Sequence, residues 1–253
     1  MKNYITYFLA IWCLWAPAVV WALPQRLFFR RPPTSSGGPI EYVGATVDTF
    51  SATRSPTVNY PTVLANDIII TVMATDTPAT FSGTPPGSGW TEEDEADDAL
   101  PDGTTVVFWK RAAGGETSEA WTNIMAANED GVVATVVFRN CKTSGSPFNQ
   151  AATPVSGGSV TNHDCPTVTT TVDGCMVVGI LGIDPASSTR TYTWDAGWDE
   201  RVGYATTPSG VNGLLGAIYI GSDLQTTAGA STPGGDFNSA EHAAKFTYAL
   251  EPQ

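Results

Sequence analysis

The sequence predicts an all-β protein, a jelly-roll-like β-sandwich of about 11–12 strands built from two internal repeats. Three observations support this fold class. One pattern of strand-like segments occurs twice along the chain. The 253 residues include 25 Gly and 18 Pro, which suits a fold with many turns. No long stretch has the sustained 3.6-residue apolar period of an amphipathic helix.

The repeat is clearest at three landmarks: a Pro-Thr-Val tripeptide, a continuous apolar run, and a Gly-Trp pair followed by Glu. They lie at 61–63, 68–73 and 89–92 in the first copy and at 166–168, 176–183 and 197–200 in the second. The offset is 105 residues at the tripeptide and 108 at Gly-Trp, as loop insertions would produce. We therefore predict repeats over about 40–142 and 163–253. Each alone would leave a sheet face open, which favours one sandwich made from both over two domains.

The first repeat is expected to open with a loosely alternating strand at 40–51. Residues 67–74 form a continuous apolar run, which predicts a central strand buried on both faces. Further strands are expected at 103–111, 116–125 and 131–140. The polar stretch 143–162, with several Gly and Pro, is predicted to be the loop that joins the repeats.

The second repeat is expected to repeat this order with a buried central strand at 175–183. The other predicted strands are 167–172, 190–194, 198–205, 214–220 and 241–250. Trp90 and Trp198 hold matching places in the two copies, so we expect both to anchor the core.

Residues 1–22 are typical of a secretory signal. Lys2 supplies the positive start, an apolar region follows, and Val20-Trp21-Ala22 resembles a cleavage site. This predicts a secreted, extracellular protein. The alternative is a retained membrane or assembly segment. No second stretch of 18 apolar residues occurs, so no membrane span is expected in the mature chain.

Residues 23–39, the arm, join the signal to the body. An apolar trio is flanked by three arginines, in the order Arg26, Leu27, Phe28, Phe29, Arg30, Arg31. The following residues 32–39 could span up to roughly 26 Å. Such a segment could add to a sheet edge of a neighbouring copy, giving a homo-oligomer that grows head to tail. Two alternatives remain: a disordered remnant, or an arm that packs on its own domain.

The charge of the body is strongly negative. Residues 40–253 hold 8 basic and 25 acidic residues, a net charge of −17. Such a surface repels phosphate backbones and anionic lipid, which argues against nucleic-acid binding. The densest acidic run contains candidate calcium ligands: Glu92, Asp94, Asp97, Asp98 and Asp102. Its spacing matches no EF-hand, so we expect a solvated acidic loop, and no cofactor other than this candidate calcium.

Removal of the signal would leave three cysteines, Cys141, Cys165 and Cys175. In an oxidising compartment this number predicts one disulfide and one spare thiol. Cys175 begins an apolar run and is expected to be a small core residue. Cys141 and Cys165 bracket the polar loop and are the favoured pair.

Residues suited to catalysis are scarce. The two histidines, His163 and His242, are 79 positions apart, and no nucleophile-elbow, P-loop or zinc-protease motif occurs. His163, Asp164 and Cys165 are adjacent, so on an extended chain they would point to alternating faces. We expect a protein that is not an enzyme.

The segments at 61–63, 67–69, 89–91, 109–112 and 114–116 together resemble a β-sandwich domain of phage virion proteins and secreted bacterial surface proteins. They are also similar to subunits of extracellular fibrils from environmental samples. The resemblance covers roughly residues 40–250 and implies a structural or surface role without catalytic residues. With the signal and the arm, it favours a filament subunit assembled through the arm. The alternative is a glycan-binding or adhesion module, which would expose Trp or Tyr clusters.

Overall fold

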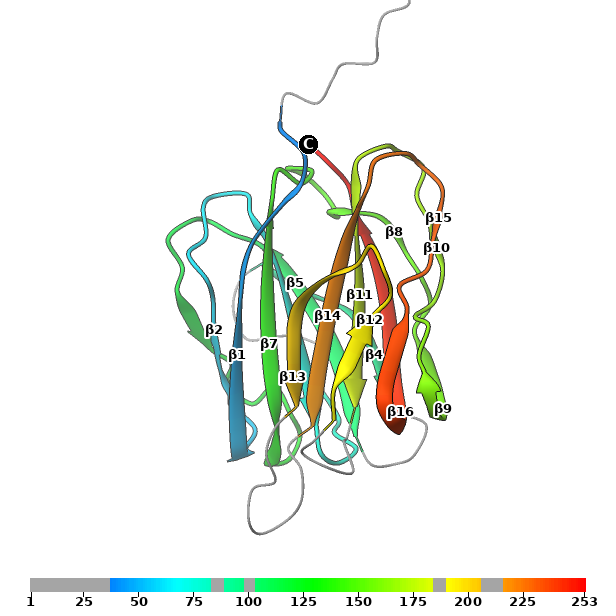
Figure 1. Ribbon diagram of the computed structural model, residues 1–253. Helices are drawn as coiled ribbons and strands as arrows, with labels where there is room; N and C mark the ends of the chain where they lie inside the picture. Colours follow the sequence, from blue (N-terminus) through cyan, green and yellow to red (C-terminus); the bar gives the residue numbers. More distant parts are fainter. Residues whose placement is uncertain (1–36, 83–88, 98–102, 184–189, 206–215) are drawn as a thin grey trace, which may run out of the picture. The chain divides into compact units, whose positions relative to one another are not determined.

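Two antiparallel β-sheets that pack face to face form the body of the protein (Figure 1). The computed structural model describes residues 37–82, 89–97, 103–183, 190–205 and 216–253. Within these residues the chain forms sixteen strands and no helix. A helix able to cross a membrane is accordingly not found in this part of the chain. The predicted all-β sandwich is confirmed.

The first sheet contains five strands, all from the first repeat. Every pairing between them is antiparallel. Their order across the sheet is β1 (Glu41–Thr53), β7 (Glu129–Arg139), β3 (Ile68–Thr75), β5 (Thr104–Arg111) and β4 (Trp90–Asp97). Strands β1 and β4 are therefore its two edges.

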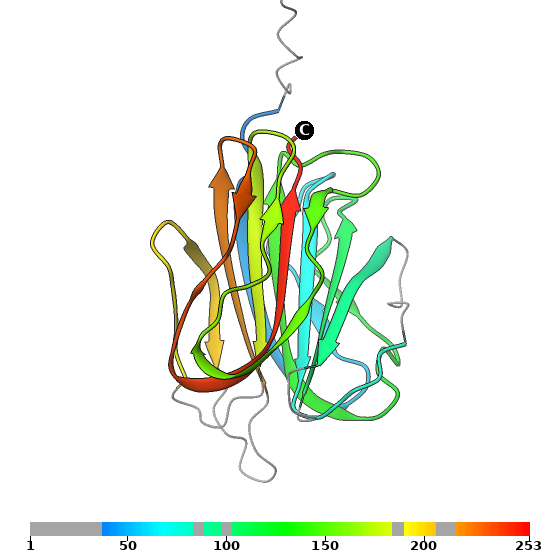
Figure 2. The same ribbon diagram turned by 90° about the vertical axis from the view of Figure 1, so that its right-hand side faces the viewer.

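The second sheet is built around the long C-terminal strand β16, shown in orange to red in Figure 2. Its strand order is β12 (Tyr192–Trp194), β16 (Gly235–Leu250), β11 (Cys175–Ile183), β14 (Ala217–Gln225) and β13 (Asp199–Ala205). On the side away from β11, β16 also pairs with β8 (Phe148–Ala151) and β9 (Val155–Asn162). Strands β9 and β13 thus lie on opposite sides of this sheet.

The duplication in the sequence is also a duplication in topology. The order β7-β3-β5-β4 in the first sheet has its counterpart in β16-β11-β14-β13 in the second. Strand β9 lies against β16 as β1 lies against β7. Each repeat also contributes a two-stranded sheet: β2 (Thr57–Asn59) with β6 (Ser118–Ala120), and β10 (Val168–Thr169) with β15 (Ala230–Ser231). Each sheet is therefore built around one repeat, and the second sheet also includes β8 and β9 from the segment between the predicted repeats.

The two sheets contact each other with approximate twofold symmetry. Strand β1 lies against β13 on one side of the sandwich, and β4 lies against β9 on the other. Because β9 is the counterpart of β1 and β13 that of β4, exchanging the repeats exchanges these two contacts. The repeats meet as the subunits of an isologous dimer do.

The inner core lies between the sheets. Ile68, Ile70 and Val72 of β3 belong to one apolar cluster with Val178 and Ile180 of β11. Every residue of β3 and β11 is buried, because alternate side chains on each strand also face a second apolar layer on the outer side of the sheet. Burial on both faces explains the two continuous apolar runs in the sequence.

Tryptophans organise the outer layers. Trp121 is fully buried on the outside of the first sheet, with its ring centroid 4.8 Å from that of Trp90 and 4.9 Å from that of Phe108. On the second sheet Trp194 stacks on Trp198 at 5.9 Å. A glycine with positive φ precedes each of the matched tryptophans: Gly89 (φ 97°) and Gly197 (φ 102°). Glycine is the residue that adopts this backbone conformation without steric cost.

The predicted strand count was too low. The segment 143–162, expected to be a loop, contains β8 and β9. Both are stabilised by main-chain pairing with β16, and the side chains of β9 are mostly exposed, so they need not be apolar. The polar, glycine-rich composition of this segment therefore does not indicate that it forms an edge strand.

The prediction of a loop for the acidic run is wrong over the part that the structure describes. Residues 90–97 form strand β4, which pairs with β5 along its length. A bulge between Glu92 and Asp94 interrupts the register. Main-chain hydrogen bonds to β5 keep this segment extended despite the repulsion among its carboxylates. Charge alone therefore does not predict its conformation.

Gly182 marks a close approach of the two sheets, since a Cβ there would overlap the buried Thr105 side chain of the facing sheet. We predict that Gly182→Ala lowers the free energy of unfolding by about 1–3 kcal/mol through overpacking. Urea unfolding followed by tryptophan fluorescence measures the change. Gly158→Ala is the matched control, because a Cβ at Gly158 meets nothing within 4 Å. Equal stability of the two variants would contradict this account of the packing.

Candidate functional site

Four of the longer strands are paired on one side only: β1 and β4 in the first sheet, β9 and β13 in the second. The short strands β8 and β12 also pair with β16 alone. Main-chain groups on the free side of an edge strand can pair with another chain. Proteins usually protect such edges with charged side chains, prolines or bulges. The protection on each edge therefore indicates which one is suited to a partner.

Three of these four edges carry charges. Strand β4 has five carboxylates, Glu92, Glu93, Asp94, Glu95 and Asp97. Strand β13 begins with Asp199, Glu200 and Arg201, and β1 contains Glu41 and Asp48. Register shifts interrupt the pairing of all four strands, so bulges do not distinguish them. Strand β9, with the sequence VSGGSVTN, differs in containing neither a charged residue nor a proline.

Strand β9 also exposes apolar side chains. The described residues include four large apolar side chains that are exposed, and two of these are Val155 (42%) and Val160 (46%) of β9. Between them lie Gly157 and Gly158, and the space around a Cβ at Gly158 is open. The edge is therefore uncharged, partly apolar and free of bulky side chains at its centre.

The His163 side chain links the end of β9 to β16 through hydrogen bonds. Its side chain is fully buried, and its Nε2 lies 2.9 Å from the carbonyl oxygen of Val160 and 3.0 Å from that of Glu241. Since both partners are acceptors, Nε2 carries the proton and donates to both. The ring packs edge-on against Phe237, and the Tyr192 hydroxyl donates to the His163 carbonyl at 3.0 Å.

The electrostatic surroundings keep His163 neutral. Burial lowers the pKa of the imidazole, and the nearby positive charge of Lys245 and the neighbouring His242 lower it further. The other ring nitrogen, Nδ1, is buried without a hydrogen-bond partner in the described structure. Protonation would add a buried charge and a second donor, Nδ1, that has no acceptor there, so folding favours the neutral ring.

The carboxylates of β4 are partly used to close the sandwich. The Trp109 indole donates to Glu93 at 2.9 Å, and the Tyr248 hydroxyl of the opposite sheet donates to Asp94 at 2.8 Å. The Thr104 hydroxyl donates to Asp97 at 2.7 Å. These donors are neutral, so they leave the negative charge of the strand uncompensated.

No carboxylate of β4 forms an ion pair with any residue in the described ranges. Burial raises the pKa of Glu93 and of Asp94, and Asp94 adds to the shift at Glu93. Burial and then the charges of Glu92 and Asp97 raise the pKa of Glu95. A cation beside this strand would relieve the repulsion.

The acidic and uncharged edges lie side by side. Strand β4 lies against β9, and the Ser156 hydroxyl of β9 donates to the carbonyl oxygen of Asp97. We call this side of the sandwich the β4/β9 side. It combines an edge strand that can pair through its main chain with a negative strand that has no ion-pair partner among the described residues.

Only three of the five candidate calcium ligands lie within the described residues. Glu92, Asp94 and Asp97 lie along β4, whereas Asp98 and Asp102 lie outside the described residues. Among the residues that the structure describes, no three His, Cys, Asp or Glu side chains are arranged to hold a metal ion.

The predicted disulfide between Cys141 and Cys165 is not formed, and Cys175 is free as well. Cys141 belongs to the inner core between the sheets, and Cys165 to an apolar cluster on the outside of the second sheet. Burial raises the pKa of both thiols to about 12. The prediction failed because the loop composition gave no information about the layer that each cysteine enters.

The predicted arm residues, Arg26 to Arg31, lie outside the described residues. The described chain begins beside its own C-terminus, where the Asn140 side chain donates to the Pro39 carbonyl at 2.9 Å. The backbone amide of Gln253 in turn donates to the backbone carbonyl of Asn140 at 3.0 Å. Residues 37–39 and the C-terminus are therefore fixed next to each other.

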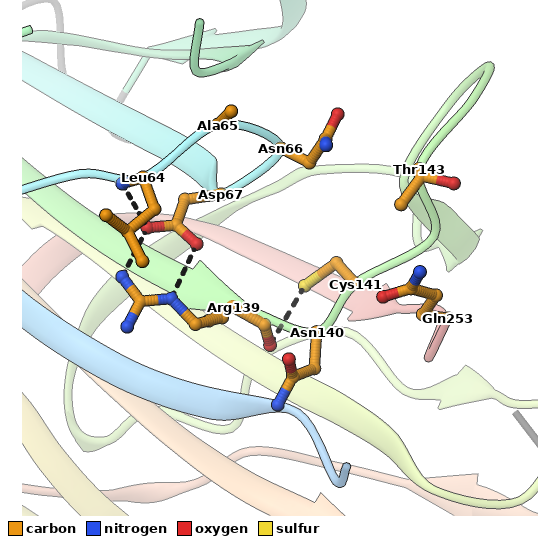
Figure 3. Close-up of a pocket in the computed structure, with 9 residues that line it drawn as sticks. All are labelled: Leu64, Ala65, Asn66, Asp67, Arg139, Asn140, Cys141, Thr143 and Gln253. Carbon is orange, nitrogen blue, oxygen red and sulfur yellow. Dashed lines mark hydrogen bonds and ion pairs between the residues drawn. The ribbon is translucent and has the colours of Figure 1, made fainter. Parts of the chain in front are cut away.

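A pocket of about 190 Å³ opens at this end (Figure 3). Its two charged groups are paired with each other: Arg139 donates twice to Asp67, at 2.9 and 2.7 Å, and the Leu64 backbone amide donates to Asp67 at 2.8 Å. Ligand sites for small molecules usually measure 300–1,000 Å³. The pocket is small and its ion pair is self-contained.

The five tryptophans after the signal segment are all described, and none is exposed. Trp121 and Trp194 are buried, and Trp90, Trp109 and Trp198 are partly buried. The exposed aromatic cluster expected of a glycan-binding module is thus not formed by tryptophans.

Comparison with known proteins finds no family model, curated protein or solved structure that matches this chain. Evidence for function accordingly comes from the β4/β9 side and from the sequence of the arm.

The buried neutral His163 predicts a pH dependence. In the unfolded chain this histidine binds a proton near pH 6.5, whereas in the folded protein it does so only at lower pH. The free energy of unfolding should therefore fall as the pH drops below about 6.5, by at most about 1.4 kcal/mol per pH unit. Urea unfolding between pH 7.5 and 5 measures this.

His163→Gln is the matched variant, because its amide can donate to the same carbonyls without titrating. Its stability should vary less with pH in this range. The carboxylates with raised pKa act in the opposite direction, but they are present in both proteins and cancel in the comparison. Identical pH profiles would rule out His163 as the source.

Proposed function

We propose that the protein is a non-enzymatic extracellular structural subunit. It polymerises head to tail when the arm of one copy adds as a strand to a sheet edge of the next. The observation that carries this proposal is the edge strand β9 on the β4/β9 side, which has neither charge nor proline. Strand addition supplies main-chain hydrogen bonds without needing a pocket.

The distribution of buried surface supports a scaffold role. Apolar side chains fill the space between the sheets and the layers outside each sheet. The aromatic rings of Trp121, Tyr192 and Tyr248 are buried within these layers. At the edge strands of the described structure, main-chain groups stay open to a partner.

The chemistry of the arm fits such a partner. Leu27, Phe28 and Phe29 are apolar residues that β-strands accommodate well, and the flanking arginines are opposite in charge to the body. Residues 32–39 provide a tether of Pro, Thr, Ser and Gly between this segment and β1. An apolar strand on a tether can reach a second molecule.

Deletion of residues 23–31 tests the proposal. We expect the intact secreted protein to form regular filaments in negative-stain images, and the deletion variant to remain monomeric in sedimentation. Its tryptophan fluorescence and thermal unfolding should match those of the unassembled intact protein.

Two substitution sets separate the contributions within the arm. Serine at positions 27, 28 and 29 should abolish filaments by removing the apolar side chains, whereas Arg→Lys at positions 26, 30 and 31 should keep them by keeping the charge. Filaments of the deletion variant, or an intact mature protein that stays monomeric at all concentrations, would refute arm-driven assembly.

A further inference from the structure

We propose that β9 is the strand that receives the arm, and that the arm comes from a second copy of this chain. This inference rests on the proposed function, because it names the surface that the arm would use. The occupant is the segment Arg26 to Arg31, and the site is the free side of β9 from Val155 to Asn162.

The other three edges are less suited to the arm. An arm strand added to β4 or β13 would place apolar residues among charged side chains, and added to β1 it would meet Glu41 and Asp48. On β1, Asp48 also accepts a hydrogen bond from the Asn59 side chain, so this edge is partly covered by β2. β9 has no charged residue, and its hydrogen bond to β4 comes from Ser156 alone among the described residues.

The side chains of β9 leave room for the apolar trio. Successive residues of an extended arm point to opposite faces of the sheet, so Phe28 would lie on one face and Leu27 and Phe29 on the other. Val155 and Val160 offer exposed apolar contacts, and Gly158 offers space without a side chain. Aromatic rings commonly cover glycines of neighbouring strands in this way.

The adjacent β4 supplies the opposite charge. The arm carries three arginines, and β4 carries five carboxylates that lack an ion-pair partner among the described residues. Because β4 lies against β9, an arm paired with β9 brings its arginines close to this strand. The proposed contact should therefore weaken as the salt concentration rises.

The position of β9 also determines how an assembly grows. The arm is continuous with β1, which lies at the β1/β13 side, whereas β9 lies on the opposite side of the sandwich. Donor and acceptor are different surfaces, so the contact is heterologous and each added copy presents a fresh β9. Such a contact extends into a filament unless the rotation closes.

A lysine on the proposed edge tests the site in the intact chain. Gly158→Lys has open space for its side chain, and it places a positive charge where the basic arm would dock. The critical concentration for assembly should rise roughly tenfold or more, since the ammonium repels the arginines of the arm. Thr49→Lys, on the exposed part of β1, is the matched control and should assemble normally. Tryptophan fluorescence and thermal unfolding check that both variants fold.

Covalent trapping gives a second measurement. Phe28→Cys combined with Val160→Cys should yield a ladder of disulfide-linked multimers after oxidation, whereas Phe28→Cys with Thr49→Cys should not. The three native thiols in the body are buried, which raises their pKa to about 11 or 12 and disfavours their reaction.

The outcomes separate the two proposals. Normal assembly of Gly158→Lys, or multimers trapped only through position 49, would overturn β9 as the acceptor while leaving arm-driven assembly intact. A cross-linked monomer at position 160 would show that the arm docks on its own molecule, which overturns the second copy as its source. Assembly that survives loss of the arm would instead overturn the proposed function itself.

Discussion

Burial of the inner face of each sheet against the other is the constraint on which this structure depends. A five-stranded sheet from one repeat has apolar residues on both faces, and its own short strands and loops cover only the outer one. The inner face needs a second sheet of the same kind, which the duplicated sequence supplies. At Gly182 the two sheets approach so closely that a methyl group would not fit beside Thr105. The edges are what this packing leaves uncovered.

The elements that the sequence predicted well are those whose side chains decide their position. The runs in β3 and β11 are apolar throughout because both faces are buried, so pattern and burial agree. The matched Gly-Trp pairs likewise reflect a backbone turn and a ring that packs on the sheet. For these strands and turns, the local sequence alone is enough to predict the structure.

The candidate site was not predicted, because main-chain pairing creates it. β9 is polar and rich in glycine, and its position follows from the free side of β16, which is distant in sequence. One signal was available: a structureless connection of twenty residues at 143–162 is unusual in a compact domain. β4 shows the same effect, since pairing with β5 overrides the repulsion among its carboxylates. The cysteines were misassigned because sequence proximity to a loop does not specify a layer.

The approximate twofold relation between the repeats has a consequence for polarity. A symmetric dimer of a single repeat would present the same edge on both of its sides, and partners could join it from two directions. In this chain the counterpart edges have diverged: β1 carries two carboxylates and continues from the arm, whereas β9 carries none. Because both repeats lie in one chain, each edge has its own residues. The two sides of the molecule therefore differ, and a polar filament of head-to-tail subunits requires such a difference.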